Sequence, residues 1–282
     1  MRIIGVSGRM QSGKDTVGAI IQYLIWKYKV EKGQSTSIHL TFDDFKRTSV
    51  GVNTTGWEIR KFADKLKDIV CLLIGCTREQ LEDREFKSKE LGKEWDKFVV
   101  RETMGSLPIE YLKIKGIFNT LEEAESFCKK SPHYFTLVES LTPRKLLQLL
   151  GTECGRDIIH NNIWVNALMS RYPPKEVINA INKTTDGSYG VKQPNWIITD
   201  VRFPNELQAV KDRGGITIRI IRPDFIENAL TGEKFPVKVH RQEHESETAL
   251  DNYKFDYEIQ NDGTIAELID KVEVILKQEK II

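Results

Sequence analysis

The sequence predicts an α/β fold in which a mainly parallel sheet is covered by helices on both faces. Two observations carry this prediction. Extended apolar runs alternate with amphipathic helical patterns along much of the 282 residues, which is typical of parallel strands joined by crossover helices. The chain also opens with an apolar run, a glycine-rich loop and a long helical pattern, which read IIGVSGRMQSGKDT and then residues 17–28.

The elements follow from the spacing of the apolar residues. After the opening strand, the apolar side chains of residues 17–28 recur at spacings of three and four, which predicts an amphipathic helix. Further extended runs predict strands, and most of them precede a helical pattern. These runs are residues 36–42, 58–62, 196–199, 216–221 and 255–259.

Three segments fit this alternation poorly. Residues 77–141 are charge-rich (REFKSKELGKEWDKF) and then helical (TLEEAESFCKK), which predicts a helical insertion that covers a site. Residues 223–250 are irregular and lid-like, and residues 184–194 carry the Gly, Pro and Asp of a surface loop. We therefore expect one domain over residues 1–282, with a substrate-cover insertion at 77–141 and a lid at 223–250.

The composition excludes several classes of protein. Lys plus Arg (42) nearly equals Asp plus Glu (41), so the formal net charge is +1, and general attraction to nucleic acid or anionic membrane is not expected. No apolar run is long enough to cross a bilayer. The four cysteines show no CxxC pair, which favours free thiols and a cytoplasmic location. They are Cys71, Cys76, Cys128 and Cys154.

The glycine-rich loop has the pattern of a phosphate-binding loop. Gly8, Gly13 and Lys14 match G-x-x-x-x-G-K, in which backbone N–H groups and the lysine bind phosphate oxygens. The alternative is a chance match in a glycine turn, but the preceding strand and following helix favour a nucleotide loop. Asp15 replaces the usual hydroxyl residue; its carboxylate can hold Mg²⁺, and the Thr16 hydroxyl can contact a phosphate.

A second acid follows an apolar run in WIITDVRFPNE. Asp200 ends the run, Arg202 follows, and Glu206 stands in the first turn of a predicted helix. At the carboxyl end of a parallel strand, Asp200 faces the same crevice as the loop. The alternative is a helix-capping acid with a surface arginine beside it. Whether Asp15 or Asp200 holds the metal stays open.

A cationic segment, TPRKLLQLLGTECGRD, can meet the acceptor's phosphate. Its helix places Arg144 and Gln148 on one face, while its leucines, at 146, 147, 149 and 150, face inward. Arg156 and Lys145 add positive charge, with solvated helix charges as the alternative reading.

An aromatic residue and a histidine pair are less informative. From its periodicity alone, Trp164 is better read as core than as a base-stacking platform. His240 and His244 are four apart, but no third ligand is evident, so surface histidines are the simpler reading.

Taken together, GRMQSGKDT, FADKLKDIV, EQLEDREFK, TPRKLLQLLGTECGR, IW and ITDVRFPNE resemble the deoxynucleoside monophosphate kinases of bacteriophages. FDYEIQNDGTIAELIDKV is similar to the last strand and helix of the wider nucleoside monophosphate kinase and dephospho-coenzyme A kinase group. The resemblance implies a P-loop NTPase fold of the nucleoside monophosphate kinase type. That fold has three layers, a mainly parallel five-stranded sheet and helical insertions.

The resemblance also implies an activity and a site. The activity is the Mg²⁺-dependent phosphorylation of deoxynucleoside 5′-monophosphates (dNMP) to diphosphates by ATP, which supplies precursors for phage DNA. Ser12, Lys14, Asp15 and Thr16 would bind ATP phosphates and metal, and Asn261 would lie near the adenine. The acceptor would be bound by residues on two motifs, and Trp164 would contact its base. These residues are Arg144, Lys145, Gln148, Arg156, Trp164, Asp200, Arg202 and Glu206.

Further points of the resemblance stay open. Asp200 would serve either the metal or the substrate's sugar, and HESE (residues 244–247) with Arg241 would belong to a lid. Two other functions remain as alternatives, a related small-metabolite kinase acting on a coenzyme precursor and a P-loop nucleotide switch or nucleic-acid ATPase. The expected partners are ATP and dNMP, without nucleic acid or membrane, and the sequence leaves a homodimer open.

Overall fold

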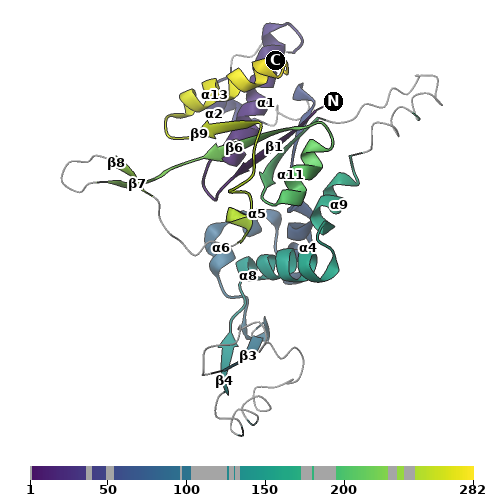
Figure 1. Cartoon of the computed structure of the whole chain (residues 1–282), viewed down its shortest axis with the longest axis vertical. Helices are drawn as coiled ribbons and strands as arrows, with labels where there is room; N and C mark the ends of the chain where they lie inside the picture. The colour runs from purple at the N-terminus through teal and green to yellow at the C-terminus, as the bar shows by residue number, and fades with distance from the viewer. Residues whose placement is uncertain are drawn as a thin grey trace. The chain divides into compact units, whose positions relative to one another are not determined.

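The computed structural model describes residues 2–35, 40–48, 54–95, 97–102, 126, 130, 134–172, 180, 195–227, 234–237 and 245–282. The chain divides into two compact units. Unit 1 comprises residues 1–65 and 162–282, and unit 2 comprises residues 66–161. The elements of each unit are drawn in Figure 1.

Unit 1 is built on a five-stranded sheet with the order β2-β5-β1-β6-β9, in which every pair is parallel. The parallel sheet and its five strands confirm the predicted fold class. The strands are β1 (Ile3–Gly8), β2 (Trp57–Arg60), β5 (Asn195–Val201), β6 (Ile216–Ile221) and β9 (Tyr257–Gln260). β1 is central, since Ile4 is paired with Ile197 on one side and Ile216 on the other.

The extended run predicted at residues 36–42 differs from the structure at its end. Residues 36–42 were expected to be extended, but Phe42 begins α2 (Phe42–Arg47) and residues 36–39 lie outside the described residues. The Thr41 hydroxyl accepts a hydrogen bond from Asp44 N–H, and Asp43 and Asp44 stand in the first turn. An N-cap threonine with acids behind it favours a helix start over the short β-branched run that suggested a strand.

Helices cover both faces of this sheet. On one face α1 (Lys14–Glu31) packs against α13 (Ile265–Gln278), and a continuous apolar core joins them to the strands. α11 (Pro204–Lys211) packs on β1 and β6, with Val210 against Gly5. Because Gly5 alternates with Ile4 and Val6, which face the α1 side, α11 lies on the opposite face. Unit 1 therefore has the three layers expected (Figure 1).

Unit 2 holds short helices and an antiparallel ribbon. Its helices are α4 (Asp64–Ile74, which begins in unit 1), α5 (Arg78–Glu82), α6 (Arg84–Ser88), η1 (Lys93–Trp95), α8 (Pro143–Gln148) and the π-type helix η3 (Leu149–Ile159). The ribbon pairs β3 (Lys97–Glu102) with β4 (Tyr134–Glu139). The segment expected as a helical insertion, residues 77–141, thus contains this ribbon as well as helices among its described residues. Of the helix expected in TLEEAESFCKK, the described residues are Ser126 and Lys130.

The segment predicted to be irregular, residues 223–250, contains regular elements. β7 (Asp224–Glu227) and β8 (Lys234–Val237) pair antiparallel, and α12 (Glu245–Thr248) follows. The predicted surface loop at residues 184–194 lies outside the described residues, as do His240, His244 and Arg241.

Two further observations concern the rest of the described chain. No helix among the described residues is long and apolar enough to cross a membrane. Cys71, Cys76 and Cys154 are free thiols, and the sulfur atoms of Cys71 and Cys76 lie 3.8 Å apart. Cys128 lies outside the described residues.

Candidate active site

The glycine-rich loop joins β1 to α1 at the carboxyl end of the sheet. Gly13 has a φ of 96°, and a Cβ there would lie 2.6 Å from the Asn261 amide nitrogen. A Cβ at Gly8 would lie 2.8 Å from the Ile220 carbonyl oxygen. Both positions thus require glycine, one for its left-handed backbone and both for close approach. The sequence places glycine where the loop must curl tightly.

Two polar groups in this loop fit an anionic ligand. The Ser12 hydroxyl is buried and has no hydrogen-bond partner among the described residues. Burial lowers the pKa of Lys14, and the nearby positive charge of Arg202 lowers it further. A buried donor without a partner and a desolvated ammonium are both stabilised when a phosphate oxygen reaches them. The loop therefore fits the phosphates of a nucleotide.

Asn261 holds this loop from the far end of the chain. Its side-chain N–H donates to the Ser12 carbonyl over 2.8 Å, and Asn261 N–H donates to the Ile221 carbonyl over 2.7 Å. Asn261 follows β9 directly, so this bond fixes the loop relative to the edge of the sheet. It shows a contact with the loop backbone, while the expected proximity to adenine stays a prediction.

Asp15 lies in the first turn of α1 and is fixed by two donors. Its Oδ1 atom lies 2.9 Å from the Thr199 hydroxyl and 2.8 Å from the Lys61 ammonium. Partial burial acts to raise the pKa of Asp15, but the hydrogen bonds and charges of Lys61, Thr199 and Lys14 outweigh it and lower that pKa overall. Asp15 is therefore an ionised and partly exposed carboxylate at the loop, with Thr16 next to it.

Asp200 lies at the end of β5, as the sequence predicted, but its oxygens bind backbone. Oδ1 accepts from Phe62 N–H over 2.8 Å, and Oδ2 accepts from Ala63 N–H over 3.0 Å. The side chain is buried, and burial raises the pKa of Asp200 even though both N–H bonds and the charges of Arg202 and Lys61 act to lower it. In this structure Asp200 holds the segment that follows β2.

Glu206 is buried at the start of α11, where it caps the helix. Its Oε2 atom accepts from Arg202 N–H over 2.8 Å and from Phe203 N–H over 3.1 Å. The Arg202 side chain in turn forms an ion pair with Glu247. Glu206 thus sets the backbone from which the Arg202 guanidinium extends.

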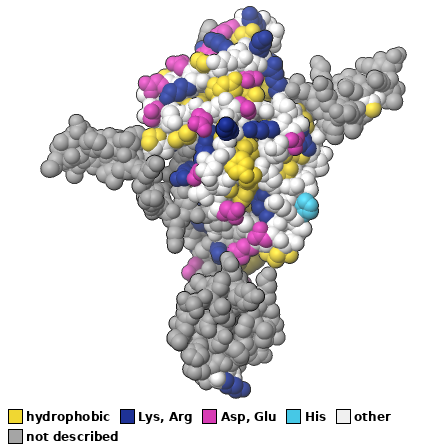
Figure 2. Space-filling view, viewed as in Figure 1, with side chains coloured by type: hydrophobic (Ala, Val, Ile, Leu, Met, Phe, Trp, Pro, Cys, Tyr) yellow, Lys and Arg dark blue, Asp and Glu magenta, His cyan; other side chains and the backbone are white. Residues whose placement is uncertain are grey.

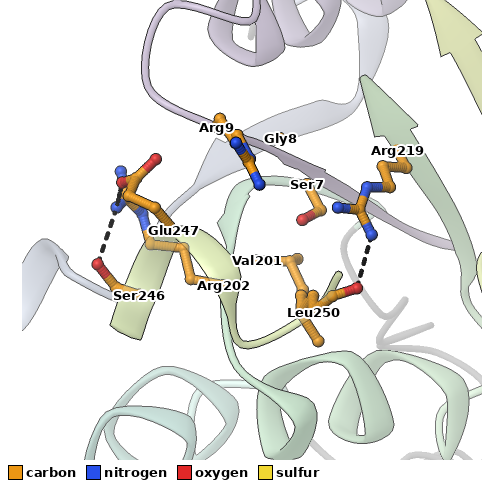
Figure 3. Close-up of a pocket in the computed structure, with 9 residues that line it drawn as sticks. All are labelled: Ser7, Gly8, Arg9, Val201, Arg202, Arg219, Ser246, Glu247 and Leu250. Atoms are coloured by element: carbon orange, nitrogen blue, oxygen red, sulfur yellow. Dashed lines mark hydrogen bonds and ion pairs between the residues drawn. The ribbon is translucent and has the colours of Figure 1, made fainter. Parts of the chain in front are cut away.

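A small pocket adjoins the loop and is drawn in Figure 3. Arg202, Ser246 and Glu247 gather at one side of it, and Arg219 with Leu250 lies at another. Glu247 Oε2 accepts from the loop's Met10 N–H over 2.6 Å. Asp251 pairs with Arg9 over 2.9 Å and with Arg219 over 2.5 Å. Two carboxylates from one segment therefore pair with three arginines beside the loop.

The residues predicted to bind the acceptor's base and phosphate differ in exposure. Trp164 on α9 (Ile163–Met169) is buried, with 6% of its surface exposed. In unit 2, Arg144 and Lys145 are exposed on α8, and Gln148 is half-buried at its end. Arg156 on η3 is buried, and its guanidinium lies 3.5 Å from the Asn161 carbonyl. Of the four leucines expected inside, Leu146 is buried and the other three are half-buried.

The structure thus brings together in unit 1 the loop residues with Asp200, Arg202 and Glu206, and it adds residues that the sequence analysis did not select. Lys61 directly precedes the motif FADKLKDIV, and nothing in the periodicity distinguishes it from a surface lysine. Arg219 and Asp251 carried no signal. Among the described residues there is no cluster of three or more Asp, Glu, His or Cys side chains that could hold a metal.

A parallel sheet whose first strand runs into a glycine-rich loop and a helix N-terminus defines the class of P-loop nucleotide-binding proteins. Within that class, the family model described as "Deoxynucleotide monophosphate kinase" matches residues 2–272. The chain belongs to the deoxynucleotide monophosphate kinase family.

Two phage proteins that bear kinase names and one uncharacterized viral protein are similar to parts of the chain. The chain is 30% identical over 123 residues to the deoxynucleoside-5′-monophosphate kinase of Escherichia phage T5, covering 43% of this chain and 40% of the relative. It is 26% identical over 188 residues to the deoxynucleotide monophosphate kinase of Escherichia phage RB69, covering 64% and 66%. It is 36% identical over 139 residues to protein ORF77 of Ictalurid herpesvirus 1 (strain Auburn), covering 49% and 50%. The matches therefore span between 40% and 66% of these relatives' lengths.

Proposed function

We propose that this protein transfers the γ-phosphoryl group of ATP to a deoxynucleoside 5′-monophosphate and releases ADP and the diphosphate. The observation that carries the proposal is the loop, whose buried Ser12 hydroxyl and desolvated Lys14 fit phosphate oxygens. Family membership supports the choice of acceptor. The relatives from phages T5 and RB69 bear names for the same class of kinase.

In the proposed reaction the chain binds and aligns two phosphate-bearing ligands, and no covalent intermediate is needed. The backbone N–H groups of the loop and Lys14 hold the ATP phosphates, and Arg202 meets the charge on the transferred group. An oxygen of the acceptor's phosphate attacks the γ-phosphorus. The bond from that phosphorus to the bridging oxygen of ADP breaks.

Mg²⁺ fits the same end of the loop, where Asp15 and Thr16 would hold it, with Asp200 as the other acid beside the loop. Hard oxygen ligands of this kind suit the ion, which would neutralise the phosphate charge when bound. Lys14 and Asp15 bring opposite charges to the start of α1. In this proposal the Lys14 ammonium binds phosphate.

For the acceptor we propose Arg144, Lys145, Gln148 and Arg156 as phosphate-side residues, with Trp164 against the base and Asp200, Arg202 and Glu206 completing the site. Arginine suits bidentate phosphate recognition. The chain then acts as one P-loop kinase domain, in which residues 77–141 cover the substrate and residues 223–250 form the lid. We place the protein in the cytoplasm of its host, as a monomer or homodimer.

A coupled assay for ADP tests the proposal. ATP and Mg²⁺ are supplied with each of the four dNMPs, their ribose counterparts and dephospho-coenzyme A as acceptors. We expect dNDP and ADP in equal amounts from at least one dNMP. Turnover of dephospho-coenzyme A alone would favour the coenzyme-precursor kinase instead, and the proposal would then be abandoned.

Two variants assign the roles. Lys14→Ala removes the ammonium from the loop, so we expect ADP formation to be lost, whereas Lys27→Ala, on the exposed side of α1, leaves it unchanged. Arg144→Ala should raise the KM for dNMP more than the KM for ATP. Retained turnover in a folded Lys14→Ala protein contradicts the proposed role of the loop.

A further inference from the structure

The carboxylate of Asp15 is held by one of its two oxygens. Both hydrogen-bonding donors, the Thr199 hydroxyl and the Lys61 ammonium, reach Oδ1. Within the described residues no hydrogen bond to Oδ2 is observed, and 59% of the side chain is exposed. A carboxylate fixed through one oxygen presents the other in a defined direction, which is how outer residues orient metal-binding carboxylates in proteins.

Lys61 is itself held in place by the turn that it opens. Lys61 N–H donates to Asp64 Oδ2 over 3.1 Å. The next two backbone N–H groups, of Phe62 and Ala63, donate to the two oxygens of Asp200. Phe62 is buried, so the turn is anchored by packing and by hydrogen bonds. The ammonium therefore extends from a fixed backbone toward Asp15, and 27% of the side chain is exposed.

The charges favour the same arrangement. Asp15 and the buried Asp200 both experience the positive charge of Lys61, which acts to lower the pKa of each. The positive charge of Lys61, 2.8 Å from Asp15, reduces the repulsion of that carboxylate toward the phosphates of a nucleotide. Without it, the Thr199 hydroxyl would be the one hydrogen-bonding partner left to Asp15 among the described residues, and the Asp15 side chain would have more rotamers available.

We propose that Lys61 is a positioning residue of the phosphoryl-transfer site, which fixes the Asp15 carboxylate beside the glycine-rich loop, while Asp200 acts by holding the Lys61 turn. This inference rests on the proposed function. It gives the two acids different tasks: Asp15 faces the ligands, and Asp200 faces the backbone. The Lys61 side chain acts through Asp15 and does not need to touch a substrate.

A double-mutant cycle tests whether Lys61 acts through Asp15. Lys61→Met should lower kcat about 10- to 100-fold, within the range that misplacement of a charged group costs, while the KM for dNMP stays near that of the wild type. In an Asp15→Asn background, Lys61→Met should cost less than about twofold, because coupled residues are non-additive. Equal losses in both backgrounds would overturn the inference.

Conservative replacement separates positioning from folding. Lys61→Arg keeps the positive charge and should recover most of the lost kcat, and Lys27→Met is the matched control on the exposed side of α1. Circular dichroism and thermal melting should show that Lys61→Met is folded, since a partly exposed ion pair contributes about 0–1 kcal/mol. If Lys61→Arg is as slow as Lys61→Met, the inference fails.

Binding gives a readout independent of turnover. The affinity for ATP is measured by calorimetry with and without Mg²⁺, and their ratio is compared among variants. We expect the ratio to fall at least about fivefold, or roughly 1 kcal/mol, in Lys61→Met and to be retained in Lys61→Arg and Lys27→Met. An unchanged ratio in Lys61→Met overturns the inference. Failure of the wild type to bind ATP or to phosphorylate any dNMP would instead reject the proposed function.

Discussion

At the scale of single residues, the ion pair between Lys61 and Asp15 makes a pH-dependent contribution. The pKa of Asp15 lies below its ordinary value because of Lys61, Thr199 and Lys14, so ionised Asp15 favours the folded state. This contribution is present above the pKa of Asp15 in the unfolded chain and is lost as the pH falls through the lower pKa of the folded state.

Lys61→Met should therefore raise the pKa of Asp15, and acid unfolding should begin at a higher pH. Carbon NMR of the Asp15 carboxyl group across an acid titration measures the first effect directly. A pKa that stays at its wild-type position would show that Thr199 and Lys14 account for the lowering without Lys61.

Glu247 is the second residue for which a definite effect is expected. Its carboxylate accepts from the loop's Met10 N–H and pairs with Arg202, so it lies where a phosphate would meet like charge. Glu247→Gln should tighten the binding of metal-free ATP by about two- to fivefold, the size of one partly exposed charge interaction. Calorimetry measures this affinity.

The matched control is Glu245→Gln, which makes the same change in charge on the same short helix at an exposed position. Its affinity for metal-free ATP should equal that of the wild type. Weaker binding by Glu247→Gln would mean that the carboxylate orients Arg202 for the nucleotide and does not compete with it.

At the scale of elements, α11 depends on a single buried carboxylate. Glu206 accepts hydrogen bonds from the backbone of Arg202 and Phe203. Glu206→Ala leaves both N–H groups without this acceptor, so unfolding in urea should show a loss of about 1–3 kcal/mol. Gln208→Ala, on the exposed side of the same helix, is the control and should change stability little. A stable Glu206→Ala protein would mean that water replaces the carboxylate.

The elements also show what sequence alone could predict. Four parts of the fold carry a local signal of apolar spacing or turn chemistry, and the structure has them where the pattern predicted. They are the opening strand, the loop, the α1 helix and the β5 strand, which contains Asp200 near its end. The end of the 36–42 run differs from the prediction because Thr41 caps a helix that begins at Phe42, and a β-branched residue suits the end of a strand as well as such a cap. The ribbon of β3 and β4 was missed because antiparallel pairing joins segments far apart in sequence.

The candidate site also has residues that the sequence predicts and contacts that it does not. The loop residues and Asp200 are predictable from motifs. The tight backbone of the loop requires glycine at fixed positions, and the end of a parallel strand places Asp200 at the same edge of the sheet as the loop. The hydrogen-bonding partners of those residues were not. Lys61 meets Asp15, and Asn261 meets Ser12, only because non-adjacent strands place them together.

At the scale of the whole molecule, the balanced charge predicts weak contact with nucleic acid. Figure 2 draws one face of the molecule, and on its described surface Lys and Arg are interspersed with Asp and Glu. The net charge of the chain is +1. We therefore expect no retardation by double-stranded DNA at about 0.15 M salt, where exposed charges are screened beyond about 8 Å. DNA should likewise leave ATP hydrolysis unchanged. Hydrolysis stimulated by DNA or RNA, without a phosphorylated small product, would favour the nucleic-acid ATPase.

The central position of β1 has a consequence for how the chain is made. β1 ends at Gly8, yet its two neighbours in the sheet begin only at Asn195 and Ile216. At a synthesis rate of about 5–20 residues per second, roughly 10–40 s pass between the synthesis of β1 and that of the first strand that pairs with it. The loop lacks its hydrogen bond from Asn261 for longer still, because Asn261 is synthesised later. A nascent chain can thus complete its nucleotide-binding loop only after Asn261 has been synthesised, and until β5 and β6 have been made an unpaired apolar strand is available to chaperones.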